Sequence, residues 1–514
     1  MKRYRLIPSV VLAMLLFVGL QACDSGFEDM NRNPNEPETV PPEYILPRAQ
    51  QTMMDRLYSM SGMNGYIGSV FAQGYAKIQY VDEDKYDFAG RLTLFDNIWQ
   101  SFYTTTMEDL RQVAVVGAET GNSTVEGIAE ILLAYNFHLM TDLWGDIPYS
   151  EALDQEAPQP RYDSQADVYD GLINDLNEAI GKLNTGQSAF GSSDLIYGGN
   201  VDNWIRFANS LKLRIAMRMS FVNQSEAAGI IQDVYNDGRY IASHDQNAEF
   251  NYLQYPYNNP VNEFARTRID HKVSRTTVTA LQELDDPRLR IYATPVQSQD
   301  LRDAGTVYQG VRNGDVNNSL PLGEASTMGH YFVAPTSPGF LMTYDEVLFI
   351  FAEAAARGML SADAEQLYNE AVTAALEKYS PARVADVLGA FSSSDVAFQH
   401  QGFRAEESPE GITQDEIDAY LSQPEVQWDS SQWRQRIGLQ KWLSLYGQGF
   451  QQWSEWRRLG VPELQPGPEA VLDEVPRRVP YPDSEDALNK TNLDEARSRL
   501  GGDTFLTRLW WDPN

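Results

Sequence analysis

Carboxylates are the most numerous side chains in this sequence that could take part in chemistry. The chain of 514 residues has 72 Asp and Glu but only 40 Lys and Arg, which gives a formal net charge of −32 at pH 7. Two carboxylates that face each other across a cleft can hydrolyse a glycosidic bond, but at this abundance acid pairs arise at every spacing by chance. A surface glycoside hydrolase is therefore an alternative that the acids themselves do not favour.

Histidines and short catalytic motifs give no stronger indication of an enzyme. None of the five histidines belongs to an HExxH metal helix, and they are scattered along the chain: His138, His244, His271, His330 and His400. The sequence has no GxSxG elbow, no GxxxxGK[ST] loop and no GxGxxG turn. We therefore predict a binding protein rather than an enzyme, with no required cofactor.

Two acidic clusters leave an irregular calcium site open. Residues 82–84 (Asp-Glu-Asp) lie close to Asp87, and Asp233 lies close to Asp237. Neither cluster follows the EF-hand pattern, because Asp87 occupies the glycine position of the first and Tyr235 occupies the third ligand position of the second.

Aromatic side chains in loops are the best candidates for ligand contact. The chain has 27 Tyr and 10 Trp, and three tyrosines fall within the ten residues NYLQYPYNNP (251–260). Tyrosine rings stack on sugar rings and their hydroxyls form hydrogen bonds, although extended peptides use the same groups. Trp442 and Trp453 have helical spacing, which is more typical of core residues. The candidate ligand-binding residues, chosen by loop position and aromatic chemistry, are Tyr80, Tyr86, Tyr255, Tyr257 and Tyr308.

The elements that must hold these loops are helices. Apolar residues recur at helical spacing from Ile128 to Leu143, and a second stripe predicts one helix over 433–458, ended by Gly460 and Pro462. Further helices are predicted over 44–60, 92–117, 165–184, 203–223, 225–236, 340–357 and 361–379. Because these helices come in pairs joined by short links, we predict a mainly α, tetratricopeptide-like scaffold, although no clean 34-residue repeat is visible.

Long loops and few strands complete the expected architecture. Segments rich in Gly, Asn, Pro and Tyr cover 237–270, 295–338 and 381–430, and loops of this length in a compact domain are usually functional. We expect them to form an irregular second lobe that faces the ligand. Short strands are predicted near 250–257 and 331–333.

The N-terminus predicts export and a lipid anchor. Basic residues precede an apolar run from Ile7 to Leu20, which is shorter than the about 20 residues of a spanning helix. Cys23 is the only cysteine and follows Leu20-Gln21-Ala22 as in a lipobox. We predict a signal peptide over 1–22, a lipidated tether over 23–42 and a binding domain over 43–514. The acidic surface excludes nucleic acid as a partner.

Several segments together resemble the SusD/RagB family of outer-membrane nutrient-binding lipoproteins, in its SusD-like branch. The segment that carries most of the resemblance is TDLWGDIPYSEA (141–152), in which Gly145 and Pro148 are expected to end the preceding helix. Other matching segments are NRNPNEP (31–37), NWIRFANSLKLRIAMRMS (203–220), LMTYDEVLFIFAEAAARG (341–358), WSEWRRLGVPEL (453–464), RVPYPDSE (478–485) and LWWD (509–512).

The resemblance implies a surface-exposed lipoprotein of the outer membrane, seated as a lid on a SusC-like TonB-dependent transporter. Members of the family take up sugars or peptides through variable loops, so no ligand residue carries over by position. An oligosaccharide is the leading ligand, a peptide is the alternative, and a scaffold without a small ligand is a third reading. The cations Arg457, Arg458 and Arg478 of these segments are expected to pair with buried acids or to cap helices rather than to contact ligand.

Overall fold

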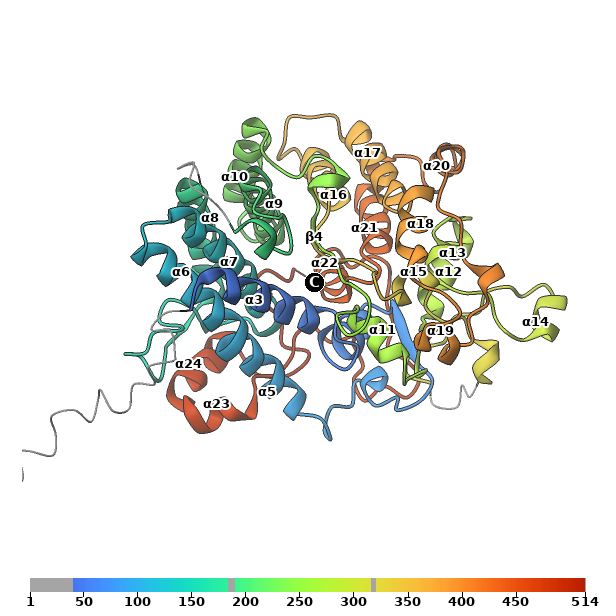
Figure 1. The fold of residues 1–514 in the computed structure, drawn as a ribbon, viewed down its shortest axis with the longest axis horizontal. Coiled ribbons are helices and arrows are strands. Elements are labelled where there is room, and N and C mark those ends of the chain that lie inside the picture. Colours follow the sequence, from blue (N-terminus) through green and yellow to red (C-terminus); the bar gives the residue numbers. More distant parts are fainter. Residues whose placement is uncertain (1–39, 184–189, 316–319, 514) are drawn as a thin grey trace, which may run out of the picture. The chain divides into compact units, whose positions relative to one another are not determined.

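The computed structural model describes residues 40–183, 190–315 and 320–513, and within them Pro42–Asn514 form one compact unit. The predicted signal peptide, Cys23 and most of the predicted tether lie outside the described residues. Helices make up most of the unit, and the strands are short (Figure 1). The prediction of a mainly α fold is confirmed.

Helices that follow one another in the chain pack side by side in the first half. They are α6 (Glu108–Glu119), α7 (Ser123–Trp144), α8 (Gln165–Leu183), α9 (Val201–Met219) and α10 (Gln224–Asp237), and each packs against the next (Figure 1). Helix α7 is buried along most of its length, because its apolar residues face neighbours on both sides. Successive antiparallel pairs of this kind give the tetratricopeptide-like scaffold that was predicted.

The predicted helix over 433–458 is wrong, because two helices occupy this stretch. They are α21 (Trp433–Ser444) and α22 (Gly449–Leu459), and Gly447 between them has φ = 84°, which favours glycine. A Cβ on Gly447 would lie 2.7 Å from the ring of Phe332. Position 447 therefore needs a glycine both for the turn and for the close packing of Phe332. The apolar spacing on either side gave no sign of this break. Gly460 ends α22, as predicted, and its φ of 67° lies in the left-handed region.

Two other predicted helices have different beginnings or interiors. The stretch 92–117 is α5 (Thr93–Gln100), a π-helical segment η3 (Ser101–Met107) and then α6. The stretch 340–357 begins as strand β6 (Gly339–Met342), and helix α16 (Tyr344–Ala356) follows it and packs on α17 (Ala364–Glu377). Helix α3 (Pro42–Leu57) packs against α6.

The strands form three antiparallel pairs within the described residues. Strand β1 (Tyr75–Lys77) pairs with β5 (His271–Val273), β2 (Ile147–Pro148) with β3 (Tyr162–Asp163), and β4 (Ala248–Phe250) with β6. The predicted strand at 331–333 is wrong, because this stretch is the short helix α15 (His330–Val333). The predicted strand at 250–257 survives only at Phe250, the last residue of β4.

The long segments predicted as loops contain several short helices. These are α11 (Pro260–Ala265), α14 (Gln299–Asp303), α18 (Pro381–Gly389), α19 (Val396–His400) and α20 (Gln414–Leu421), while α12 (Arg275–Glu283) and α13 (Leu289–Tyr292) lie between the first two segments. The C-terminal helices are α23 (Asp483–Leu488) and α24 (Lys490–Leu500). The second lobe is thus irregular but more helical than the composition indicates.

Buried arginines near the C-terminus join segments that are far apart in the sequence. The guanidinium of Arg458 lies 2.5–2.6 Å from both carboxylate oxygens of Glu353, and it also contacts Glu455 at 2.8 Å. Arg457 donates to the carbonyl of Asp142 in the last turn of α7 (2.8 Å). Arg478 lies 2.7 Å from Asp503. The predicted structural role of the three arginines is confirmed.

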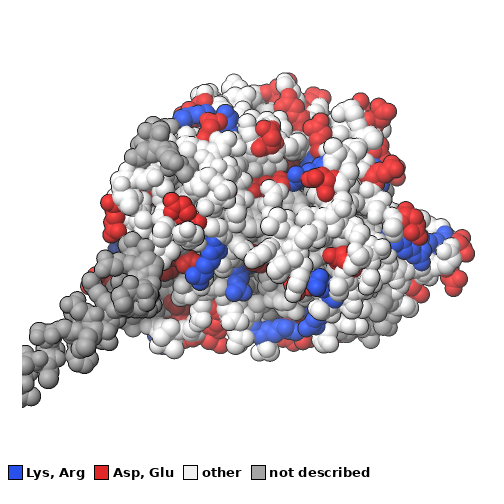
Figure 2. Space-filling model, viewed as in Figure 1, with Lys and Arg blue, Asp and Glu red and all other residues white. Residues whose placement is uncertain are grey.

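Acidic and basic side chains are unevenly distributed over the face seen in Figure 2. Asp and Glu gather toward its upper and right-hand edges, and Lys and Arg follow its lower edge, below α11 of Figure 1. The excess of acid in the sequence therefore does not extend over the whole surface.

Candidate functional site

The candidate site lies at the end of the antiparallel pair that β1 forms with β5. The register pairs Lys77 with His271, and the ladder continues one residue further, where the amide of Ile78 donates to the carbonyl of Asp270 (2.9 Å). In an antiparallel pair, each step forward along one strand is matched by one step back along the other. Continuing the register therefore places position 80 opposite position 268. The guanidinium of Arg268 lies 5.4 Å from the centre of the Tyr80 ring.

Tyr255 repeats this arrangement two residues away on the same segment. The guanidinium of Arg266 lies 4.4 Å from the centre of the Tyr255 ring, within the range of a cation–π contact. Arg266 and Arg268 are separated by one residue, so their Cα atoms are at most about 7 Å apart. Two tyrosines from different loops are thus held beside a single Arg-Thr-Arg segment.

The tyrosine rings remain open to solvent. Tyr80, Tyr255 and Tyr257 expose 60%, 61% and 58% of their area, which is high for a large aromatic residue. We call Tyr80, Tyr255, Tyr257, Arg266, Arg268 and His400 the Tyr–Arg surface. Exposed rings beside cations can stack on sugars or on other flat groups while the guanidinium groups bind polar substituents.

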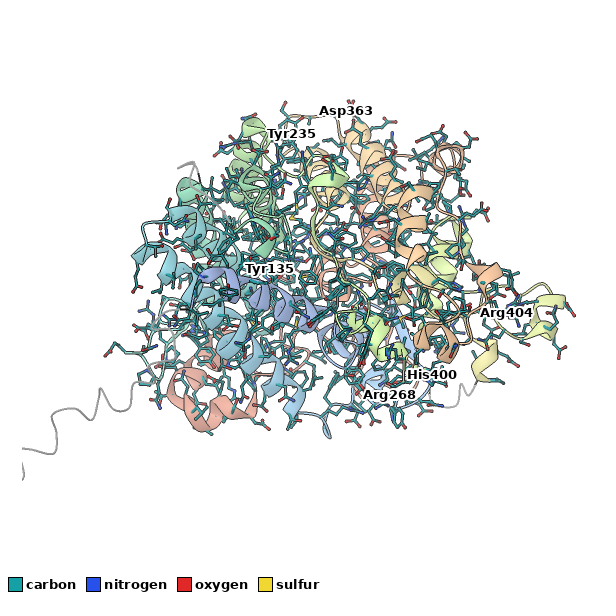
Figure 3. The ribbon with its side chains drawn as sticks, in the orientation of Figure 1. Tyr135, Tyr235, Arg268, Asp363, His400 and Arg404 are labelled. Atoms are coloured by element: carbon teal, nitrogen blue, oxygen red, sulfur yellow. The ribbon has the colours of Figure 1, made fainter. Side chains whose placement is uncertain are left out.

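Helix α19 fixes the Arg-Thr-Arg segment from the other side. The side-chain amide of Gln401, directly after α19, donates to the carbonyls of Ala265 (2.9 Å) and Arg268 (2.6 Å). His400 precedes Gln401 and is exposed, and Figure 3 shows it close to Arg268. The surface is therefore assembled from three segments far apart in the sequence.

The backbone of Tyr80 adopts a conformation that bulky residues rarely take. Its φ is 53°, in the left-handed region, where a Cβ atom costs roughly 1–2 kcal/mol. The fold thus holds an exposed ring in place against a local preference, and such residues cluster at functional sites.

Tyr308 lies in a different place from the other exposed candidates. It lines a cleft of about 680 Å³ with residues of α12, α13 and α20, including Arg290 and Tyr420. Burial raises the pKa of the Tyr308 hydroxyl. The structure therefore separates Tyr308 from the Tyr–Arg surface.

Tyr86 was expected on an exposed loop, and this expectation is wrong. Only 1% of its area is exposed, and its ring meets the ring of Phe71 edge-on at 5.6 Å. A ligand on the surface cannot stack on it. Tyr86 belongs to the core.

The acids at 82–84 are occupied by donors from the protein. Glu83 lies 2.6 Å from the ammonium of Lys77 and 2.6 Å from the guanidinium of Arg91. Asp84 accepts from the amide of Gly314 (2.9 Å) and the side chain of Asn313 (2.6 Å), and burial raises its pKa to about 6. Within residues 40–183, 190–315 and 320–513, no cluster of three or more His, Cys, Asp or Glu is arranged to hold a metal ion.

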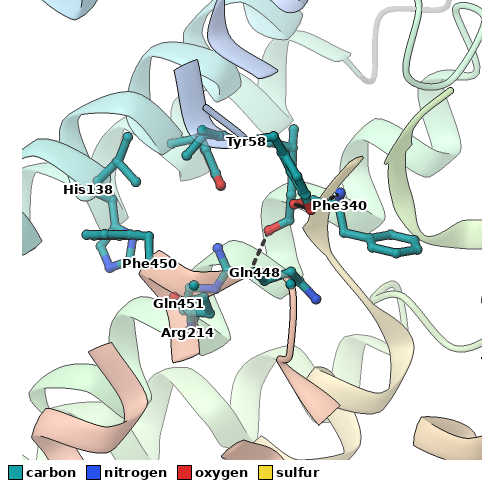
Figure 4. A pocket seen from close by; sticks show the side chains of 13 residues that line it. Tyr58, His138, Arg214, Phe340, Gln448, Phe450 and Gln451 are labelled. Carbon is teal, nitrogen blue, oxygen red and sulfur yellow. Dashed lines mark hydrogen bonds between the residues drawn. The ribbon is translucent and has the colours of Figure 1, made fainter. Parts of the chain in front are cut away.

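One pocket is too small for a sugar. It is lined by Tyr58, His138, Arg214 and Gln448, among others (Figure 4). Its volume of about 30 Å³ corresponds to about one water molecule. Burial lowers the pKa of His138 to about 4, so its ring is neutral at pH 7.

A second groove of about 530 Å³ opens beside α5, η3 and α23. Its lining includes Trp99, Tyr103, Leu153 and Leu488. Trp99 and Tyr103 were read from the sequence only as part of a helix. Helical spacing gave no sign that a groove would open over them.

The sequence reading also missed the cations of the Tyr–Arg surface. Arg266 and Arg268 stand six to eight residues after the tyrosine-rich loop and looked like ordinary surface charge. The available signal was the alternation Arg-Thr-Arg next to an aromatic loop in an acidic protein. His400 could not be linked to them without the position of α19.

Comparison with known proteins connects this architecture to a family. A family model described as starch-binding proteins associating with the outer membrane matches residues 34–482. The chain belongs to the SusD-like family. In the TDLWGDIPYSEA segment, Gly145 ends α7 as expected, with φ = 91° and ψ = −117°, a region open to glycine.

Solved structures of SusD-like proteins have the same fold. A chitin-binding protein is 27% identical, with a TM-score of 0.76 over 92% of this chain and 100% of its own. A chitin-binding SusD homologue from Flavobacterium johnsoniae is 23% identical, with a TM-score of 0.74 over 91% and 99%. A SusD homologue from Bacteroides uniformis is 24% identical, with a TM-score of 0.73 over 92% and 100%. No curated protein matches the chain.

Membership in this family associates the protein with the outer membrane and with nutrient binding. None of the helices among the described residues is both long and apolar enough to cross a bilayer.

Proposed function

We propose that this protein is a surface lipoprotein, anchored through Cys23, that captures an oligosaccharide on the Tyr–Arg surface and delivers it to a SusC-like TonB-dependent transporter. The observation that carries the proposal is the pair of exposed rings, Tyr80 and Tyr255, each of which contacts one arginine of the Arg-Thr-Arg segment. Flat, solvent-exposed rings suit the apolar faces of sugar rings.

Chitin binding by a relative that is 27% identical supports a glycan ligand. The exposed rings form an open surface, which suits a polymer better than a single enclosed sugar. A peptide remains the second candidate, because aromatic surfaces with nearby hydrogen-bonding groups also bind extended peptides.

We propose that the glycan is bound without being cleaved. Hydrolysis requires two carboxylates across a cleft from each other, with separations of about 5–9.5 Å. Near the Tyr–Arg surface, Glu263 lies 3.3 Å from Arg266, and Asp270 is buried 3.9 Å from Lys77. Acids engaged in this way are poorly suited to protonate a leaving group.

The test is calorimetric titration of the full-length protein in detergent micelles with glycans and peptides, alongside Tyr80→Ala, Tyr255→Ala and Tyr257→Ala. We expect a glycan to bind, at least two of the substitutions to weaken it, and chromatography to recover it intact. Tyr44 on α3 is 74% exposed, so Tyr44→Ala serves as a matched control that should leave binding unchanged.

Binding of peptides alone would move the protein to the second candidate, and shortened glycans would show an enzyme. Delivery is tested separately by copurification with a co-expressed barrel transporter. A Cys23→Ser variant that still partitions with the outer membrane would contradict the lipid anchor.

A further inference from the structure

We infer that the oligosaccharide bound by the Tyr–Arg surface carries carboxylate or sulfate groups. The inference rests on the proposed function, because it names the class of glycan that the same surface takes. It starts from the guanidinium of Arg268, which is the most exposed cation of this surface.

Arg268 is held in place by an aromatic ring rather than by an acid. Its side chain is exposed and its guanidinium lies 5.4 Å from the centre of the Tyr80 ring. Among the residues that the structure describes, no carboxylate forms an ion pair with it. Its backbone carbonyl accepts a hydrogen bond from the side-chain amide of Gln401, which fixes the segment that presents the arginine side chain.

The acids of the surrounding segments do not neutralise this charge. Three of them have a cation nearby: Asp82 lies 3.7 Å from Lys85, Glu263 lies 3.3 Å from Arg266, and Asp270 lies 3.9 Å from Lys77, which also pairs with Glu83 at 2.6 Å. Among the described residues, Arg268 is thus left as a guanidinium without an ion pair, beside the exposed ring of Tyr80. His400, which directly precedes Gln401, is exposed and adds ring nitrogens that can form hydrogen bonds.

The charge of Arg268 is opposite in sign to the net charge of the whole protein. A net charge of −32 repels an anionic glycan at long range, but salt limits that field to about 8 Å under physiological conditions. Contacts at the surface are then decided by the nearest groups. Lys and Arg follow the lower edge of the face in Figure 2, where α11 and Arg268 lie in Figures 1 and 3.

The geometry matches the two chemical parts of an acidic sugar. A guanidinium presents a planar fork that binds a carboxylate or sulfate through two parallel hydrogen bonds. The ring of Tyr80 next to it offers a face for the sugar ring itself. A neutral sugar would use the ring and leave the charge of Arg268 without a counter-charge.

The experiment compares charged oligosaccharides with uncharged twins of the same backbone. Full-length protein in detergent micelles is titrated with oligogalacturonate and its methyl ester, and with a carrageenan oligosaccharide and its desulfated form. We expect at least one charged probe to bind about tenfold more tightly than its twin, with this preference weakening as salt is raised.

Two variants assign the preference to its residue. Arg268→Gln should abolish the preference while leaving the thermal midpoint unchanged. Arg239→Gln removes a guanidinium of intermediate exposure next to α10, which pairs with Asp237 at 3.1 Å, and should keep the preference.

The outcomes separate this inference from the proposed function. Tyr80-dependent binding of neutral and charged twins with equal affinity would overturn the acidic-glycan inference and leave glycan capture in place. Absence of binding by every glycan would overturn both. Binding of a polyglutamate peptide as tight as that of the best glycan would also overturn the inference, because the surface would then select charge without sugar.

Discussion

The ring of Tyr80 lies over the guanidinium of Arg268, with 5.4 Å between the ring centre and the guanidinium carbon, at the point where the β1–β5 ladder ends. Residues 80 and 268 are 188 positions apart in the sequence. A short strand pair that is itself buried thus determines which side chains meet on the surface beyond its end.

Replacing Tyr80 by glycine should separate stability from binding. Tyr80 has φ = 53°, a conformation that glycine adopts without steric cost. We expect Tyr80→Gly to be more stable than Tyr80→Ala by about 1 kcal/mol, whereas both lose glycan affinity. Urea unfolding gives the free energies and calorimetry the affinities. An alanine variant more stable than the glycine variant would contradict the strained backbone.

Removing one partner of the buried Glu353–Arg458 pair should strongly destabilise the fold. Both side chains are fully buried, and Glu353→Gln would remove the carboxylate that binds the Arg458 guanidinium through both oxygens, while Glu455 would still face Arg458, Lys441 and Arg218. We expect a loss of about 3–5 kcal/mol in the free energy of unfolding, measured in urea. The double variant Glu353→Gln with Arg458→Met should lose less than the sum of the two single changes. Simple additivity would show that the pair is not coupled.

Truncation to alanine should lower stability strongly at the buried Tyr86 and hardly at all at the exposed Tyr255. Tyr86 is buried, so Tyr86→Ala should cost about 3–5 kcal/mol of stability, while Tyr86→Phe keeps the ring and should bind glycan normally. Tyr255 is exposed, so Tyr255→Ala should change stability by less than about 0.5 kcal/mol. Thermal melts measure the difference. Equal losses in the two alanine variants would contradict their different burial.

Buried histidine should make the protein less stable in mild acid. His330 packs among Phe391, Phe398 and Phe403, and burial lowers its pKa from 6.5 to about 4. Between these two values the unfolded chain binds a proton that the folded chain does not, so stability is retained above about pH 6.5 and falls as the pH drops toward 4. At pH 5 the loss from this residue is up to about 2 kcal/mol.

The measurement is the thermal midpoint at pH 7 and pH 5 for the wild type, His330→Phe and His400→Phe. We expect the midpoint of His330→Phe to fall less than that of the wild type. His400 is exposed, so its variant should follow the wild type. If the midpoint of His330→Phe fell between pH 7 and pH 5 as much as that of the wild type, His330 would not be the source of the acid sensitivity.

Patterns within one helix could be read directly from the sequence. Apolar spacing placed the helices now labelled α7, α8, α9 and α17 within a few residues of their bounds, because one buried face imposes its period on neighbouring positions. The same reasoning failed at Gly447, where one stripe runs through two helices. The break depends on Phe332 and Asn64, which lie in other parts of the chain.

The role of Arg457, Arg458 and Arg478 was also predictable, because a charged side chain among large apolar residues must find a partner when it is buried. Which acid each would meet was not. Glu353 lies 105 positions before Arg458, and only the packing of α16 on α21, and of α21 on α22, brings them together.

Composition and local spacing were enough to show that this chain is helical, acidic and without the local motifs of an enzyme, and that its loop tyrosines are candidate ligand contacts. These properties depend on composition and on spacing over a few residues. Tertiary structure alone decided that Tyr86 is buried, that Tyr308 lines a separate cleft, and that Tyr80 and Tyr255 share the Arg266–Arg268 segment. Exposure and proximity follow from strand register and from packing between distant segments, which residue types and local spacing do not encode.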